Sequence, residues 1–152
     1  MEIKGLLQKL SQAPGIAGEE TAAVELVVQM LKEYTDSIRV NPLGSVIATI
    51  KEPDEGAPAL LLDAHIDQIG LIVTHIEENG FLRVGNCGGI DRRLLLAQRV
   101  TVFGKRPFTG IIASKPPHLQ SGEEAKKVPE MDEIFIDTGY SSKELELSLI
   151  HI

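Results

Sequence analysis

The sequence predicts a protein of the α/β class, in which an α/β lobe is followed by a mostly β segment. Three observations indicate this architecture. Two helical patterns come first, short strand-like runs follow them, and the second half consists largely of strand-like runs joined by turns. At 152 residues the chain is long enough for one domain with a core or for two small lobes.

Two helices are expected near the N-terminus. Apolar residues 3, 6, 7 and 10 recur at helical spacing and predict a short amphipathic helix, which ends at the turn 14–18. Glu19 and Glu20 follow, at a place where negative charge favours the start of a second helix. One face of that helix carries Ala22, Ala23, Leu26, Val27, Met30, Leu31 and Tyr34.

Strands are expected at residues 37–40 and 46–50, with a turn at 41–44 and a charged surface loop at 52–58. Residues 59–62 form a short, continuous apolar run. Such a run is typical of a strand covered on both faces in the middle of an α/β sheet.

After Gly70 the pattern predicts a compact β-rich insertion from about residue 71 to about residue 142. Asn79-Gly80 lies between two strand-like runs, at 71–76 and 81–84, and indicates a hairpin. Further strands are predicted at 98–103, 109–114 and 134–137.

Composition excludes several classes of function. The 15 basic and 22 acidic residues give a net charge of −7, which disfavours a nucleic-acid partner. No apolar run approaches the ~20 residues of a membrane span, and the N-terminus lacks a secretory signal pattern. One cysteine precludes an internal disulfide framework, so a cytoplasmic location is expected.

The strongest chemical signal is His65-Ile66-Asp67, just after the apolar run 59–62. Residues two apart on an extended segment point to the same side, and open α/β sheets bind ligands at the carboxyl ends of their strands. A neutral imidazole can bind Zn²⁺, and a neighbouring carboxylate can orient it. By itself the tripeptide is more typical of a structural histidine than of a metal ligand, and its position after the apolar run only partly shifts that balance.

The other polar residues have simpler interpretations. Asp63 is assigned a structural role, His75 lies within a strand-like run, and His118 is expected on a rigid loop. Cys87 is followed by Gly88-Gly89, which predicts a tight turn rather than a nucleophile, since no base is indicated nearby.

Residues 64–73, with sequence AHIDQIGLIV, resemble the first metal-site motif of the glutamyl and deblocking aminopeptidases. These are cellulase-M-like metallopeptidases that assemble as tetrahedral dodecamers. The resemblance extends in order over nearly the whole chain. Its other stretches are PGIAGEE at 14–20, GGID at 88–91, AQRV at 97–100, KPPHL at 115–119 and IFIDTG at 134–139.

The resemblance implies a zinc-peptidase-like α/β catalytic domain, begun by residues 1–70, and a β-rich dimerisation insertion at 71–146. It implies peptide substrates, a homo-oligomer and two divalent metal ions, zinc or cobalt, that activate a water molecule. His65 matches the family's first terminal metal ligand, and Asp67 matches the catalytic aspartate that orients it.

Two departures qualify the resemblance. Gln68 stands where many members carry a charged residue, outside the metal's immediate ligands. The family's other ligands and its general base come from sequence beyond this chain, so the chain alone is expected to be inactive. Residues 147–152 do not fit the family and match a translated sequencing adapter, which predicts a non-native tail in which His151 has no function.

Two alternatives remain open at this stage. One is a non-catalytic oligomerisation or peptide-binding module built on the β-rich insertion. The other is a glycan hydrolase, which needs two carboxylates flanking the glycosidic bond. The low aromatic content, 4% of residues, offers little surface for stacking on sugars.

Overall fold

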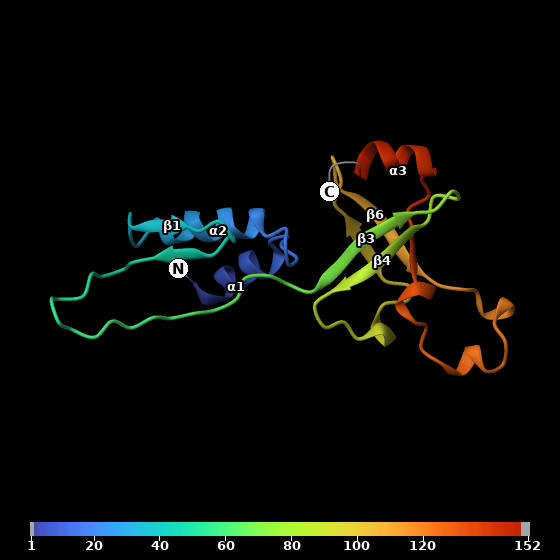
Figure 1. The fold of residues 1–152 in the computed structure, drawn as a ribbon, viewed down its shortest axis with the longest axis horizontal. Helices are drawn as coiled ribbons and strands as arrows, with labels where there is room; N and C mark the ends of the chain where they lie inside the picture. Colours follow the sequence, from blue (N-terminus) through green and yellow to red (C-terminus); the bar gives the residue numbers. More distant parts are fainter. Residues whose placement is uncertain (1, 150–152) are drawn as a thin grey trace. The chain divides into compact units, whose positions relative to one another are not determined.

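A computed structural model describes residues 2–149 of the chain. The chain divides into two compact units, Met1–Gln68 and Ile69–Ile152. Each unit is described by itself. The mixture of helices and strands agrees with the α/β class expected from the sequence (Figure 1).

The first unit begins with the two expected helices, α1 (Ile3–Gln12) and α2 (Thr21–Leu31). The turn between them passes close to α2, because a side chain added at Gly15 would have its Cβ only 3.0 Å from the Cβ of Ala23. Ala23 is the buried residue of this helix pair. Small residues at both positions therefore allow the turn to lie against the helix.

A two-stranded antiparallel sheet follows, formed by β1 (Ile38–Val40) and β2 (Val46–Ala48). The Oδ1 atom of Asn41 accepts hydrogen bonds from the backbone N–H groups of Leu43 (3.0 Å) and Ser45 (2.9 Å). Such local bonds from an asparagine side chain favour turns. The strands predicted at 37–40 and 46–50 are confirmed, and β2 ends two residues earlier than expected.

The predicted strand at residues 59–62 is wrong in this structure. These residues form no strand, and the side chains of Leu60, Leu61 and Leu62 are 85%, 82% and 85% exposed. A strand requires a neighbour that takes up its backbone hydrogen bonds. Within residues 2–149 no strand pairs with this run, and Figure 1 draws it as extended chain without an arrow.

The second unit contains an antiparallel five-stranded sheet with the order β3-β4-β7-β6-β5. β3 and β5 lie at its edges, and β7, the last strand in sequence, is inserted beside β4. The bounds are Gly70–Ile76 for β3, Leu82–Cys87 for β4, Arg99–Val102 for β5, Phe108–Ala113 for β6 and Phe135–Asp137 for β7.

The predicted hairpin at Asn79-Gly80 is confirmed and joins β3 to β4. Gly80 has a φ of +85°, a conformation that favours glycine, and its N–H donates to the carbonyl of Glu77 at 2.8 Å. A Cβ at Gly80 would lie 2.2 Å from the carbonyl oxygen of Tyr140. The hairpin therefore packs against the segment that leads from β7 to the last helix.

The core of the molecule lies in this second unit. It is formed by apolar side chains from the strands, from the last helix, and from Leu95 and Ile134 in the connecting segments. The largest fully buried side chains are Leu82, Ile112, Ile134 and Leu145. Nine residues make up the cluster: Leu82, Val84, Leu95, Val102, Ile112, Ile134, Ile136, Leu145 and Leu149.

Helix α3 (Ser142–Leu149) was not expected from the sequence. Its start is capped by Ser141, whose N–H and hydroxyl both donate to the carboxylate of Glu144, at 2.9 and 2.6 Å. Leu145 and Leu149 are buried. Positions 147–149 of the predicted tail thus belong to this helix, and positions 150–152, with His151, lie outside the described residues.

Short 3-10 turns connect the strands of the second unit. They are η1 (Arg92–Leu94), η2 (Pro117–Leu119), η3 (Glu124–Lys126) and η4 (Met131–Glu133).

Candidate functional site

His65 and Asp67 lie together on an extended segment at the end of the first unit. The Nδ1 atom of His65 is 3.2 Å from Oδ1 of Asp67 and 3.1 Å from its backbone carbonyl oxygen. The His65 side chain is 86% exposed and that of Asp67 is 42% exposed. This geometry allows Asp67 to accept a hydrogen bond from Nδ1–H, so that Nε2 carries the free lone pair.

The segment that carries this pair is held by Gln68. Its backbone N–H donates to the carbonyl of Gly15 at 2.8 Å, and its Nε2 donates to the carbonyl of Ala13 at 3.0 Å. An isolated parallel bridge also joins Gln68 to Ile16. The turn between α1 and α2 thus positions the residue that directly follows Asp67.

The contact between Gln68 and Ala13 is not predicted by the sequence, in which Gln68 only departs from the pattern of the family that the chain resembles. Ala13 lies 55 positions away, and no local pattern relates the two residues. That departure is the one feature of the sequence that could have drawn attention to Gln68. A charged carboxylate at position 68 could not donate the bond to the Ala13 carbonyl.

The donor set around His65 decides whether a metal ion could be held there. A catalytic zinc ion is held by about three protein ligands. Among residues 2–149, no group of three His, Cys, Asp or Glu residues is placed to hold a metal ion. Among these residues, His65 and Asp67 supply one imidazole and one neighbouring carboxylate, which do not make up a complete metal site.

The other polar residues singled out in the sequence have the following places in the structure. His75 is an exposed residue of β3, and His118 lies in the 3-10 turn η2. Cys87 is half-buried at the end of β4. Gly88 has a φ of +80°, which agrees with the predicted tight turn. Asp63 is exposed.

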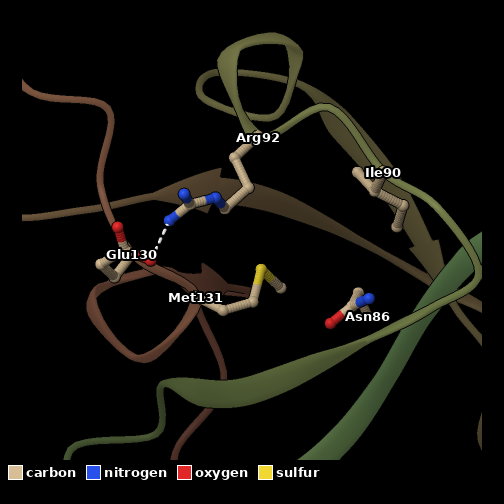
Figure 2. A pocket seen from close by; sticks show the side chains of 5 residues that line it. All are labelled: Asn86, Ile90, Arg92, Glu130 and Met131. Atoms are coloured by element: carbon tan, nitrogen blue, oxygen red, sulfur yellow. Dashed lines mark hydrogen bonds and ion pairs between the residues drawn. The ribbon is translucent and has the colours of Figure 1, made fainter.

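The second unit contains a cavity of about 270 Å³ lined by Asn86, Ile90, Arg92, Glu130 and Met131 (Figure 2). The Arg92 guanidinium points at Glu130 and forms an ion pair with it, and it also donates to the carbonyl of Pro129 at 3.0 Å. The charge in this cavity is therefore already paired. The arrangement joins the loop after β4 to the loop before β7.

Two surface carboxylates of the second unit have pKa values of about 2. The pKa of Asp91 is lowered to about 2 mainly by the hydrogen bond from the Arg93 side chain. The pKa of Glu124 is lowered to about 2 first by the backbone N–H of Ser121 and then by the Lys115 ammonium group. Both carboxylates stabilise local loops through these bonds.

No helix within residues 2–149 is long and apolar enough to cross a membrane.

Comparison with protein families identifies a match over residues 44–152 to the family described as M42 glutamyl aminopeptidase. The lysyl aminopeptidase of Pyrococcus furiosus is 36% identical over 143 residues, which are 91% of this chain and 40% of that protein. The chain thus spans about two fifths of the length of this relative.

Solved structures of peptidases are also similar to this chain. A TET aminopeptidase from a marine sediment archaeon of the Thaumarchaeota has a TM-score of 0.89 and 36% identity, with 98% of this chain and 42% of that chain covered. The TET1 peptidase of Pyrococcus horikoshii, described as assembling into a tetrahedron or a large octahedral shell, has a TM-score of 0.80 and 38% identity. That match covers 96% of this chain and 43% of that one.

Proposed function

Because the chain belongs to the M42 glutamyl aminopeptidase family, we propose that it forms part of an enzyme that removes N-terminal residues from peptides. The matched residues 44–152 include both His65 and Asp67. Since the chain spans about 40% of the Pyrococcus furiosus relative, the activity is proposed for a longer protein of which this chain is one part.

The observation that carries the proposal is the contact between His65 and Asp67. The carboxylate, 3.2 Å from Nδ1, fixes the ring tautomer and its orientation. Nε2 of His65 then becomes the first terminal ligand of a metal centre, with Asp67 as the aspartate that orients it. Gln68 holds the same segment against the turn after α1 through its bond to Ala13.

The proposed cofactor is a pair of divalent ions, zinc or cobalt. When bound, such ions would supply Lewis-acid activation of the water that hydrolyses the peptide bond. The residues described here provide one imidazole for them, while a catalytic zinc ion needs about three protein ligands. This chain by itself is therefore expected to bind metal weakly and to hydrolyse no peptide.

Two measurements test the proposal. On the chain alone, isothermal titration calorimetry with Zn²⁺ or Co²⁺ should show weak binding or no stoichiometric binding. Tight binding of two ions by this chain would contradict the proposal that His65 is only one ligand of a larger set.

In the longer enzyme, His65→Ala should abolish hydrolysis of chromogenic aminoacyl nitroanilides. Asp67→Asn should lower metal affinity or activity by roughly 10–100-fold, the usual cost of losing the partner of a ligating histidine. His75→Ala, a histidine of β3 that lies in the other unit, serves as the matched control and should keep activity. Full activity of the His65→Ala enzyme would refute the proposed ligand.

We further propose a homo-oligomer, supported by the assemblies described for the structural neighbours. The cytoplasmic location that we propose for it rests only on the single cysteine of the chain. Light scattering on the longer enzyme measures its mass, and a monomer would refute this part. The glycan hydrolase alternative has less support, because the matching family is a peptidase family. A non-catalytic peptide-binding module remains the competing function, and hydrolysis by the longer protein would exclude it.

A further inference from the structure

The cavity of about 270 Å³ in the second unit holds charges of both signs beside an apolar wall. The side chains of Arg92 and Glu130, which form its ion pair, are 34% and 71% exposed, so a ligand from solvent can reach both. Ile90 and Met131 are partly buried and pack against the core. Figure 2 shows these side chains and Asn86 around one space. The cavity thus combines a supported apolar surface with an accessible pair of opposite charges.

The guanidinium of Arg92 uses one of its nitrogens for both of its bonds within residues 2–149. Nη1 donates to the Glu130 carboxylate and to the carbonyl of Pro129, the latter at 3.0 Å. A guanidinium carries five N–H donors, and the edge formed by Nε and Nη2 matches the two oxygens of a carboxylate. The two bonds from Nη1 therefore fix the group in place and leave this edge for a ligand.

Arg93, the next residue in the same 3-10 turn, has the contrasting arrangement. Its Nε lies 2.9 Å from Oδ1 and 3.0 Å from Oδ2 of Asp91, and its Nη2 lies 2.5 Å from Oδ2. The same edge of Arg93 is thus filled by a carboxylate of the chain itself. The two neighbouring arginines differ in this respect, because only the edge of Arg92 remains for a carboxylate from outside.

The charges of the cavity favour a ligand that is neutral overall. Because Arg92 and Glu130 already neutralise each other, a purely anionic or purely cationic ligand would bring an unmatched charge into the cavity. A ligand with one carboxylate and one ammonium group would place each beside the opposite charge. Since the two side chains are in direct contact, the two groups of the ligand have to lie close together, as they do on the α-carbon of an amino acid.

The volume and the apolar wall define the rest of the ligand. Sites for drug-sized molecules have roughly 300–1,000 Å³, so a cavity of about 270 Å³ suits a smaller one. Ile90 and Met131 offer contact to an aliphatic side chain, and methionine adapts to its shape. Nδ2 of Asn86 donates to the carbonyl of Gly88 at 3.0 Å, which leaves Oδ1 as an acceptor. Figure 2 shows this oxygen on the side nearer Met131.

We propose that this cavity binds a free α-amino acid with an aliphatic side chain, such as leucine. Nε and Nη2 of Arg92 donate to its carboxylate, and the Glu130 carboxylate accepts from its ammonium group. Oδ1 of Asn86 accepts a second ammonium hydrogen, while the aliphatic side chain lies on Ile90 and Met131. Such an amino acid is also a product of the proposed peptide hydrolysis, and this link alone rests on the proposed function.

Titration of the isotope-labelled chain with L-leucine, followed by NMR, tests the proposal. The dissociation constant should be about 1 mM or lower, and amide signals should shift within residues 86–92 and 129–131, which surround the cavity. Isocaproate lacks the ammonium group, and leucinamide lacks the carboxylate. Each should bind roughly 10–100-fold more weakly than leucine, the usual cost of losing a charge-assisted hydrogen bond.

Two arginine variants form a matched pair. Arg92→Gln should weaken leucine binding roughly 10–100-fold, whereas Arg93→Gln makes the same change in the same turn and should leave binding nearly unchanged. Glu130→Gln should weaken the binding of leucine and not that of isocaproate, which has no ammonium group. Unchanged amide signals of β4 and β6 show that a variant keeps its fold. If a variant loses them, the three ligands on the unmodified chain decide the question.

The proposal is overturned if leucine at about 10 mM, ten times the expected dissociation constant, shifts no signal around the cavity. It is also overturned if isocaproate and leucinamide bind as tightly as leucine, or if two folded arginine variants behave alike. The experiment measures binding to this chain, which is expected to hydrolyse no peptide. An inactive longer enzyme would therefore refute the proposed function and leave this site standing, whereas absent binding would refute the site and leave the proposed function standing.

Discussion

Leu82 tests whether the second unit depends on one well-packed core. It lies at the start of β4, opposite Ile76 of β3 and Ile136 of β7, and is 0% exposed. Leu82→Ala removes buried methyl groups from the centre of the sheet. Leucine-to-alanine changes at such positions cost about 2–5 kcal/mol. A unit of about 80 residues has a free energy of unfolding of roughly 4–12 kcal/mol.

The substitution should therefore remove a large share of the unit's stability. With a urea dependence of roughly 1 kcal/mol per molar, the unfolding midpoint should fall by about 2–5 M. Urea unfolding of the whole chain, followed by circular dichroism of the sheet, measures this shift. If the free energy of unfolding of the second unit lies at the lower end of its range, Leu82→Ala should abolish the cooperative unfolding transition of this unit.

Leu94→Ala is the matched control, because it makes the same chemical change at a side chain that is 69% exposed in η1 of the same unit. Its effect should stay within about 0.5 kcal/mol. Equal losses at Leu82 and Leu94, or a loss below about 1 kcal/mol at Leu82, would refute the assignment of this core.

Two further predictions concern backbone geometry and pH. Gly80→Ala should destabilise the second unit by about 2–4 kcal/mol in urea unfolding, because φ is +85° and the new Cβ would meet the Tyr140 carbonyl at 2.2 Å. Gly122→Ala, with open space around it, should cost little, and equal effects would contradict the close contact. For Glu124, the folded-state pKa of about 2 lies below the ordinary value of 4.5, so its ionised form stabilises the Ser121 loop at higher pH. That contribution should be lost as pH falls from about 4.5 towards 2, and a carboxylate titration by NMR with a midpoint near 4.5 would disprove it.

Much of the local structure follows from short-range patterns. The spacing of apolar residues predicted both N-terminal helices, because a helix returns to the same face every three or four residues. Asn79-Gly80 predicted the β3–β4 hairpin, since the turn needs a residue that accepts a positive φ. The proximity of His65 and Asp67 follows from the two-residue period of extended chain.

Other features depended on contacts between distant parts of the chain. The sheet order places β7 between β6, the strand that precedes it in sequence, and β4, and no local pattern specifies the pairing of Ile136 with the distant Leu82. Helix α3 is held by burial of Leu145 and Leu149 in the shared core. The bond from Gln68 to Ala13 joins residues 55 positions apart.

The apolar run 59–62 shows most clearly which features depend on local sequence and which depend on contacts between distant parts of the chain. Its composition determined that it should be buried, because four consecutive apolar residues favour removal from water. Only the tertiary structure decided that it is exposed, because a strand exists only where a neighbour takes up its backbone hydrogen bonds. The proximity of His65 and Asp67 could be read from their spacing, whereas the contacts of Gln68 that hold the same segment appear only in the tertiary structure.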